Sequence, residues 1–196
     1  FPEEWQKYQE LKSDSSYEDV RFNPKTGAVI ARSVAHNEHL MANGATTYFG
    51  SEHLTGTDLE RECQLELFRM GHSCILEAEG ITTGNTNFPQ VSLDTTTDWR
   101  RMDIRSVTQD TAHFRNHILA KNKQLRKWNQ LSDDNHADSL ILYFHDASLY
   151  SAGKVIEGYE KATNLHAKDH PGEFHLYIRH IYCVVRGQDD WIAFDF

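Results

Sequence analysis

Two periodicities alternate along the chain and predict a mixture of strands and helices. Residues 139–144 form a nearly continuous apolar run, which is typical of a strand covered on both faces. Apolar residues that recur every third or fourth position predict amphipathic helices at 57–70, 110–128 and 151–162. Further β-prone runs predict strands at 73–78, 101–107, 174–185 and 191–194. This order of elements favours an α/β (α+β) fold with a mixed central sheet flanked by helices.

The first fifty residues carry a different pattern, a short polar helix followed by a hairpin. Residues 20–22 and 28–31 are β-prone, and the segment 23–27 between them is rich in turn residues. We therefore expect residues 1–50 to form an N-terminal extension, a helix with a β-hairpin. Residues 51–196 are expected to form the main domain.

The helix at 57–70 has recognisable signals at both ends. Thr57 and Glu60 have the spacing of a capping box, and Gly71 is placed to end the helix. Two roles stay open for Glu60, because its carboxylate can cap the helix or serve as a metal ligand.

The strand at 101–107 places unlike charges on one side. Alternation directs Asp103 and Arg105 to one face, and Met102 and Ile104 to the other. The same pattern fits an exposed strand that carries a simple ion pair. The acidic helix and Asp94 before this strand, and the basic helix after it, favour a functional site.

The charge of the chain is uneven. The 20 basic and 29 acidic residues give a net charge of −9, which argues against general polyanion binding. Residues 100–127 nevertheless hold eight basic and two acidic residues. We predict that four residues of the basic helix contact substrate phosphates, unless they form only a solvated face: Arg115, Lys123, Arg126 and Lys127.

Three carboxylates stand in an order that suits a divalent metal. Hydrolysis of a phosphodiester with such a metal needs oxygen ligands for the ion and a cation near the attacking water. Glu60, Asp94 and Asp103 provide the ligands, and we predict that Mg²⁺ or Mn²⁺ binds among them.

The order Glu60, Asp94, Asp103-x-Arg105, Gln124 resembles the PD-(D/E)xK nuclease superfamily. The nearer resemblance is to the C-terminal nuclease domains of contact-dependent inhibition toxins and related polymorphic or phage-associated toxins. It covers roughly residues 57–159. The resemblance implies a restriction-endonuclease-like fold and a metal-dependent nuclease acting on RNA rather than DNA, with tRNA as the expected substrate. It also implies an immunity protein as partner, and delivery as an effector fragment into the cytoplasm of a target cell.

One position departs from the family, which usually has lysine where this chain has Arg105. Arginine is a broad planar cation and fits poorly where a compact ammonium contacts water. Lys121 lies three residues before Gln124 and on the same side of the helix. We predict that Lys121 reaches the carboxylates and replaces the missing cation, with Arg105 holding the phosphate; the alternative is that Lys121 extends to the helix edge. The predicted catalytic residues are Asp103, Arg105, Lys121 and Gln124.

Two other functional classes remain open. Metal-independent ribonucleases of the barnase, EndoU, colicin and RelE-like type use histidine for acid–base chemistry, and His36, His39 and His53 are candidates here. A catalytically inactive phage-associated structural or interaction domain is the third class.

Composition limits the remaining possibilities. No apolar run approaches the ~20 residues that span a membrane, so we expect no membrane partner. If the protein is not a delivered effector, we expect it to be cytoplasmic. Cys63, Cys74 and Cys183 form neither a zinc pattern nor a disulfide framework.

Overall fold

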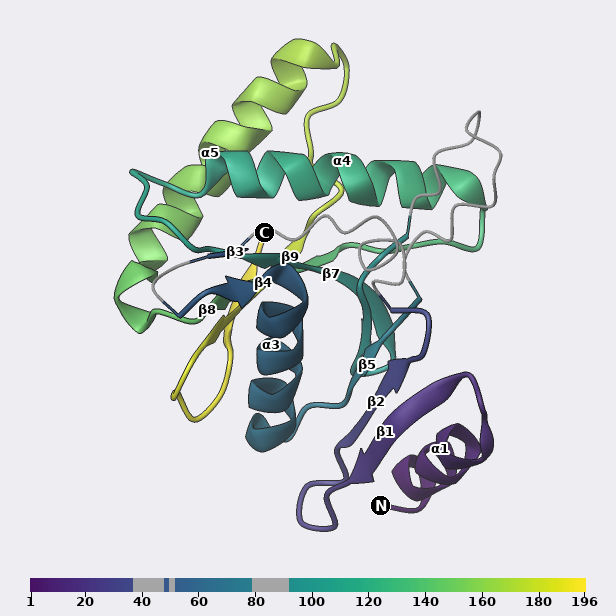
Figure 1. Ribbon diagram of the computed structural model, residues 1–196. Coiled ribbons are helices and arrows are strands. Elements are labelled where there is room, and N and C mark those ends of the chain that lie inside the picture. Colours follow the sequence, from purple (N-terminus) through teal and green to yellow (C-terminus); the bar gives the residue numbers. More distant parts are fainter. Residues whose placement is uncertain (37–47, 50–51, 79–91) are drawn as a thin grey trace. The chain divides into compact units, whose positions relative to one another are not determined.

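The computed structural model describes residues 1–36, 48–49, 52–78 and 92–196 (Figure 1). Eight strands form a mixed sheet in the order β1-β2-β5-β6-β7-β8-β9-β10, with both parallel and antiparallel neighbours. The predicted α/β class with a mixed sheet is therefore confirmed. A separate pair consists of β3 (Tyr48–Phe49) and β4 (Leu54–Thr55).

The chain divides into two compact units, Phe1–Met102 and Asp103–Phe196. These units are defined by how densely their residues contact one another. They do not test the boundary expected near residue 50 between an N-terminal extension and a main domain, which remains a prediction.

In the first unit, the N-terminal helix packs on a hairpin. Helix α1 (Pro2–Ser13) precedes β1 (Tyr17–Phe22) and β2 (Val29–Ser33), which pair antiparallel, so the predicted hairpin is confirmed. Its core cluster combines residues of α1 and three strands: Tyr8, Leu11, Val20, Ala31 and Ile75.

Helix α3 (Gly56–Met70) begins slightly earlier than predicted. Its capping box consists of Thr55 and Asp58, so the prediction of Thr57 and Glu60 as the capping pair is wrong. The reason is that Thr57 already lies inside the first turn, where its hydroxyl cannot serve as the N-cap. Gly71 ends the helix with φ 95°, a left-handed conformation that glycine adopts without a steric cost.

Strands β5 (Cys74–Leu76) and β6 (Thr95–Thr97) follow in this unit. β5 runs parallel to β2 and antiparallel to β6, and β6 is antiparallel to β7 (Arg100–Ser106). Helix α3 is joined to β2 and β5 by the buried Gln64 amide, which donates to the carbonyl oxygens of Ala31 and Cys74.

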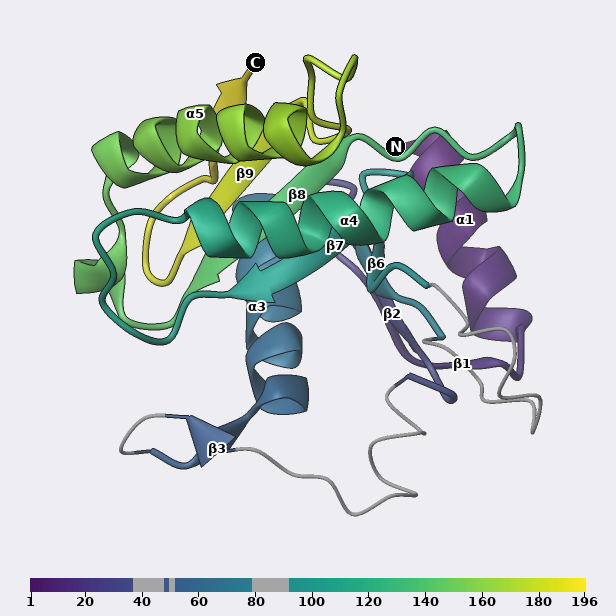
Figure 2. The ribbon, with the colours of Figure 1, turned by 90° about the horizontal axis from the view of Figure 1, so that it is seen from above.

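The second unit is built on parallel strands. β7 pairs with β8 (Ser139–Phe144), and β8 with β9 (His180–Val185); β10 (Ile192–Asp195) adds antiparallel to β9. Helices α4 (Arg115–Leu131) and α5 (Ala152–Asp169) lie beside each other over one face of these strands (Figures 1 and 2). A short turn of 3₁₀ helix at Ala147–Leu149 precedes α5.

Some boundaries in this unit differ from the predicted ones. Helix α4 starts at Arg115 rather than 110, because the buried Phe114 uses its backbone N–H to bind the carbonyl of Lys154. Strand β9 is shorter than predicted, and Phe174 before it is 71 % exposed. Ile156 within α5 is 53 % exposed, because Gly158 and Ala162 are on the buried side of the helix.

Candidate catalytic site

The centre of the candidate site in the second unit is an ion pair between β7 and α4. Lys121 Nζ lies 2.7 Å from Oδ2 of Asp103. The Asp103 side chain is 2 % exposed and that of Lys121 20 %. The predicted contact between Lys121 and this carboxylate is therefore present, in place of an extension to the helix edge; its catalytic role is a separate question.

Arg105 faces the same helix, as the alternation of β7 predicts. Its Nε donates a hydrogen bond of 2.9 Å to Nδ1 of His117 on α4. An arginine only donates, so Nδ1 of His117 is the unprotonated ring nitrogen and the proton is on Nε2. This bond fixes the direction in which the guanidinium points.

His117 is the residue of this site that the sequence analysis missed. Burial, and next the nearby guanidinium of Arg105, lower the pKa of His117 from 6.5 to about 4. The imidazole is therefore neutral at pH 7 and accepts the bond from Arg105. The available signal was its spacing, because His117 lies four residues before Lys121 and thus on the same helix face.

Gln124 completes this face of α4. His117, Lys121 and Gln124 stand at positions i, i+4 and i+7, which lie nearly in line along a helix. Gln124 is half-buried. The second unit thus brings a carboxylate, an ammonium, a guanidinium and a neutral imidazole to the interface of one strand and one helix.

The other two predicted metal ligands belong to the first unit. Glu60 on α3 contacts Nε2 of the buried His36 at 2.6 Å. Nδ1 of His36 lies 2.6 Å from the carbonyl oxygen of Glu77, to which it donates. Glu77 in turn donates its backbone N–H to the carbonyl of Asp94 at 2.9 Å. Glu60 and Asp94 are therefore linked through His36 and Glu77.

Asp94 is buried and directly precedes β6. The Arg101 guanidinium binds the carbonyl oxygens on both sides of it, those of Leu93 (2.6 Å) and Thr95 (3.2 Å). The backbone that carries this carboxylate is therefore held at two points.

Within the parts of the chain that the structure describes, no three His, Cys, Asp or Glu side chains are grouped closely enough to hold a metal ion. A complete ligand set is thus not assembled there, and the metal prediction stays a prediction. Of the histidines proposed for metal-independent chemistry, His36 uses both ring nitrogens inside the protein and His53 is exposed. His39 lies outside the described residues.

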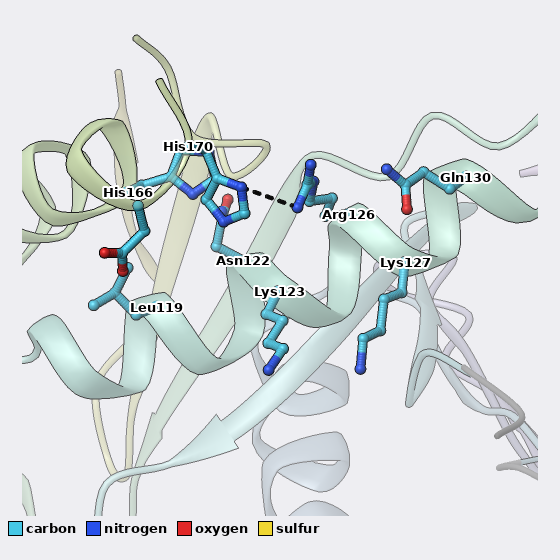
Figure 3. A pocket seen from close by; sticks show the side chains of 9 residues that line it. Leu119, Asn122, Lys123, Arg126, Lys127, Gln130, His166 and His170 are labelled. Atoms are coloured by element: carbon cyan, nitrogen blue, oxygen red, sulfur yellow. Dashed lines mark hydrogen bonds between the residues drawn. The ribbon is translucent and has the colours of Figure 1, made fainter. Parts of the chain in front are cut away.

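Three basic residues of α4 lie on a different side of the helix from Lys121, and the prediction that they contact substrate phosphates stays a prediction. Lys123, Arg126 and Lys127 line a pocket of about 460 Å³ between α4 and α5 (Figure 3). At 3.6 residues per turn they project to roughly the opposite side of the helix from Lys121. Arg115 is not among the lining residues, and its Nε instead binds Asn116.

Comparisons with known proteins give no relative for this chain. No protein-family description matches the sequence, and neither a curated protein nor a solved structure matches it. No helix in the described segments is long and apolar enough to cross a membrane.

Proposed function

We propose that this protein is a nuclease that hydrolyses phosphodiester bonds at a site formed by Asp103, Arg105, Lys121 and Gln124. The observation that carries the proposal is the 2.7 Å pairing of Lys121 with the buried Asp103. A carboxylate beside a compact ammonium is the combination that this chemistry needs, and α4 supplies the ammonium that β7, with Arg105 in place of a lysine, does not have.

The residues divide the work according to their chemistry. Lys121 neutralises Asp103, and its partly accessible ammonium can donate to water or to a phosphate oxygen. Arg105, oriented by His117, holds the phosphate with the donors that His117 does not use, because a guanidinium fits a phosphate in a bidentate manner. Gln124 offers an amide for orienting the substrate.

A divalent metal belongs to the same proposal. Mg²⁺ or Mn²⁺ would be held by Glu60, Asp94 and Asp103, and would supply a water of lowered pKa and charge neutralisation.

The biological setting that we propose follows from the toxin resemblance. The substrate is nucleic acid, RNA rather than DNA, with tRNA as the first candidate. The protein is then a delivered effector fragment that acts in the cytoplasm of a target cell and is neutralised by an immunity protein.

The test is cleavage of total tRNA and of plasmid DNA by the purified protein in Mg²⁺, Mn²⁺ or EDTA. We expect cleavage of tRNA in either metal, none in EDTA, and none with Asp103→Asn in any buffer. Cleavage that persists in EDTA would contradict the metal dependence. Full activity of a folded Asp103→Asn protein would contradict the site.

A further inference from the structure

The pocket between α4 and α5 has the chemistry of an anion site. Three cationic side chains from α4 line it, those of Lys123, Arg126 and Lys127, together with the imidazoles of His166 on α5 and of His170, the residue that follows α5 (Figure 3). Asp169 is the one carboxylate among the described lining residues. The cations therefore outnumber the anions at the wall of the pocket.

Two buried nitrogens at this pocket lack a hydrogen-bond partner among the described residues. They are Nε of Arg126 and Nε2 of His166, whose residue is only 5 % exposed. A buried polar atom without a partner costs about 1–3 kcal/mol, so such atoms commonly mark a place where another molecule binds. Both nitrogens can donate to an anionic oxygen.

A carboxylate of the protein already lies against this group. Oε2 of Glu173 is 3.4 Å from Nδ1 of His170, 3.5 Å from Nε2 of His166 and 3.7 Å from a terminal nitrogen of Arg126. These separations are longer than those of a strong charged hydrogen bond, which are about 2.7–2.9 Å. The position of Glu173 therefore shows where negative charge is favoured, but its contacts with Arg126 and His166 are too long to be strong hydrogen bonds.

The imidazoles of His166 and His170 lie against each other. Their rings stack with centroids 4.5 Å apart. Burial, and then the neighbouring His170, lower the pKa of His166, so its ring is neutral at pH 7. Nδ1 of His170 accepts a hydrogen bond of 3.2 Å from the Arg126 guanidinium, so Nε2 of His166 is the ring nitrogen that can donate to a ligand here.

We propose that this pocket binds the phosphate group of a phosphorylated ligand of mononucleotide size. The cations of α4 would hold the charge, while Arg126 and His166 would donate to the phosphate oxygens in place of their long contacts with Glu173. The volume of about 460 Å³ falls within the ~300–1,000 Å³ of ordinary small-molecule sites. Because these residues face away from Lys121, the proposal does not depend on hydrolysis at Asp103.

The test is titration of the ¹⁵N-labelled protein with inorganic phosphate, followed by NMR at the Arg126 Nε–H and at the His166 ring. We expect saturable shifts of both signals. Lys123→Ala, which removes an exposed side chain, and Arg126→Lys should each weaken binding by about tenfold or more, as expected for a lost charged hydrogen bond. Glu173→Gln should tighten binding, because it removes the competing carboxylate. Lys168→Ala, on α5 outside the pocket, is the matched control and should change nothing.

Titrations with nucleosides, nucleotides and oligonucleotides then identify the kind of molecule that carries the phosphate. A mononucleotide that binds more tightly than phosphate, while its nucleoside fails to bind, supports a free nucleotide as ligand. Tighter binding of a 5′-phosphorylated oligonucleotide than of its 5′-hydroxyl form supports the end of a strand. The proposal is overturned if phosphate produces no saturable shift at tens of millimolar, or if Lys123→Ala and Arg126→Lys both bind phosphate as the unaltered protein does.

Discussion

Asp103 is a buried carboxylate that pairs with a lysine of the neighbouring helix. Asp103 is almost fully enclosed, and an isolated charge in such a place would be costly. Lys121 compensates with an ion pair at 2.7 Å while a fifth of its own side chain stays accessible. The carboxylate is enclosed, whereas the ammonium that pairs with it reaches the solvent.

At the residue scale, part of this site could be predicted from the sequence. The alternation of β7 correctly placed Asp103 and Arg105 on one face, and helical spacing correctly suggested that Lys121 meets the carboxylate. His117 could not be assigned, because nothing in the local pattern shows that its neighbour across the interface is a guanidinium. The cap at Thr55 was missed because Thr57 and Glu60 have the same spacing as the true pair.

The first prediction concerns the neutral state of His117. Its folded-state pKa of about 4 lies below the ordinary 6.5, so as the pH falls the unfolded chain takes up this proton before the folded one does. The contribution of His117 to stability is therefore constant above pH 6.5 and decreases between about pH 6.5 and 4.

NMR titration of the histidine rings measures this directly, with the His117 signal assigned by its absence in His117→Gln. We expect that signal to keep its neutral position at pH 5. His117→Gln should also make the free energy of unfolding depend less on pH in that interval. A midpoint near 6.5 for His117 would show that burial and Arg105 do not control it.

At the element scale, the contact between α4 and α5 is the packing that positions both sites of the second unit. Gly158 lies where α5 approaches the start of α4, and an added Cβ would meet the backbone nitrogens of Phe114 and Arg115 at 2.8 Å. Backbone atoms cannot move aside as a flexible side chain can. The helices approach closely because position 158 has no side chain.

The second prediction tests the close packing of α4 and α5 by substituting two glycines of α5. Gly158→Ala should lower the free energy of unfolding by about 1–3 kcal/mol, since overpacking forces backbone shifts. Gly153→Ala is the matched control, because its Cβ would lie 3.7 Å from the hydroxyl of Ser151, an ordinary contact. Urea unfolding measures the free energy of unfolding of both variants. Equal values for Gly158→Ala and Gly153→Ala would contradict the close packing at position 158.

The existence of most elements was predictable, whereas several boundaries were not. The apolar run of β8 and the hairpin of β1 and β2 are local signals, and both are confirmed. The start of α4 depends on a backbone bond from Phe114 to Lys154, forty residues away, and no local pattern contains it. For the same reason the pocket could not be predicted, since its imidazoles come from the end of α5 and its cations from α4.

At the scale of the whole molecule, an acidic chain carries a localised basic segment. Net charge −9 disfavours contact with nucleic acid over most of the surface, so the nucleic-acid binding that we propose would depend on the few cations that are grouped. Lys123 and Lys127 are exposed members of that group.

The third prediction follows from this polarity. The double variant Lys123→Glu/Lys127→Glu should weaken tRNA binding at low salt and reduce the slope of log affinity against log salt by about two. The control Lys12→Glu/Lys25→Glu makes the same change in net charge at exposed positions of the first unit, and should leave the slope nearly unaltered. If the two variants changed tRNA binding and its salt slope equally, the change would be due to net charge alone. Lys123 and Lys127 would then belong to a solvated face of the helix.

The most direct test of the catalytic pair is a single-turnover cleavage cycle at saturating tRNA, with Asp103→Asn, Lys121→Met and the double variant. When two residues act as a unit, the double variant cleaves no more slowly than the slower single variant. We therefore expect each single variant to lower the cleavage rate by at least about a hundredfold, and the double variant to be no slower than the slower of the two. Lys123→Met, on the far side of α4, should retain the rate at saturation. Full activity of a folded Lys121→Met protein, or losses that multiply in the double variant, would contradict the pairing of Asp103 and Lys121 as the catalytic unit.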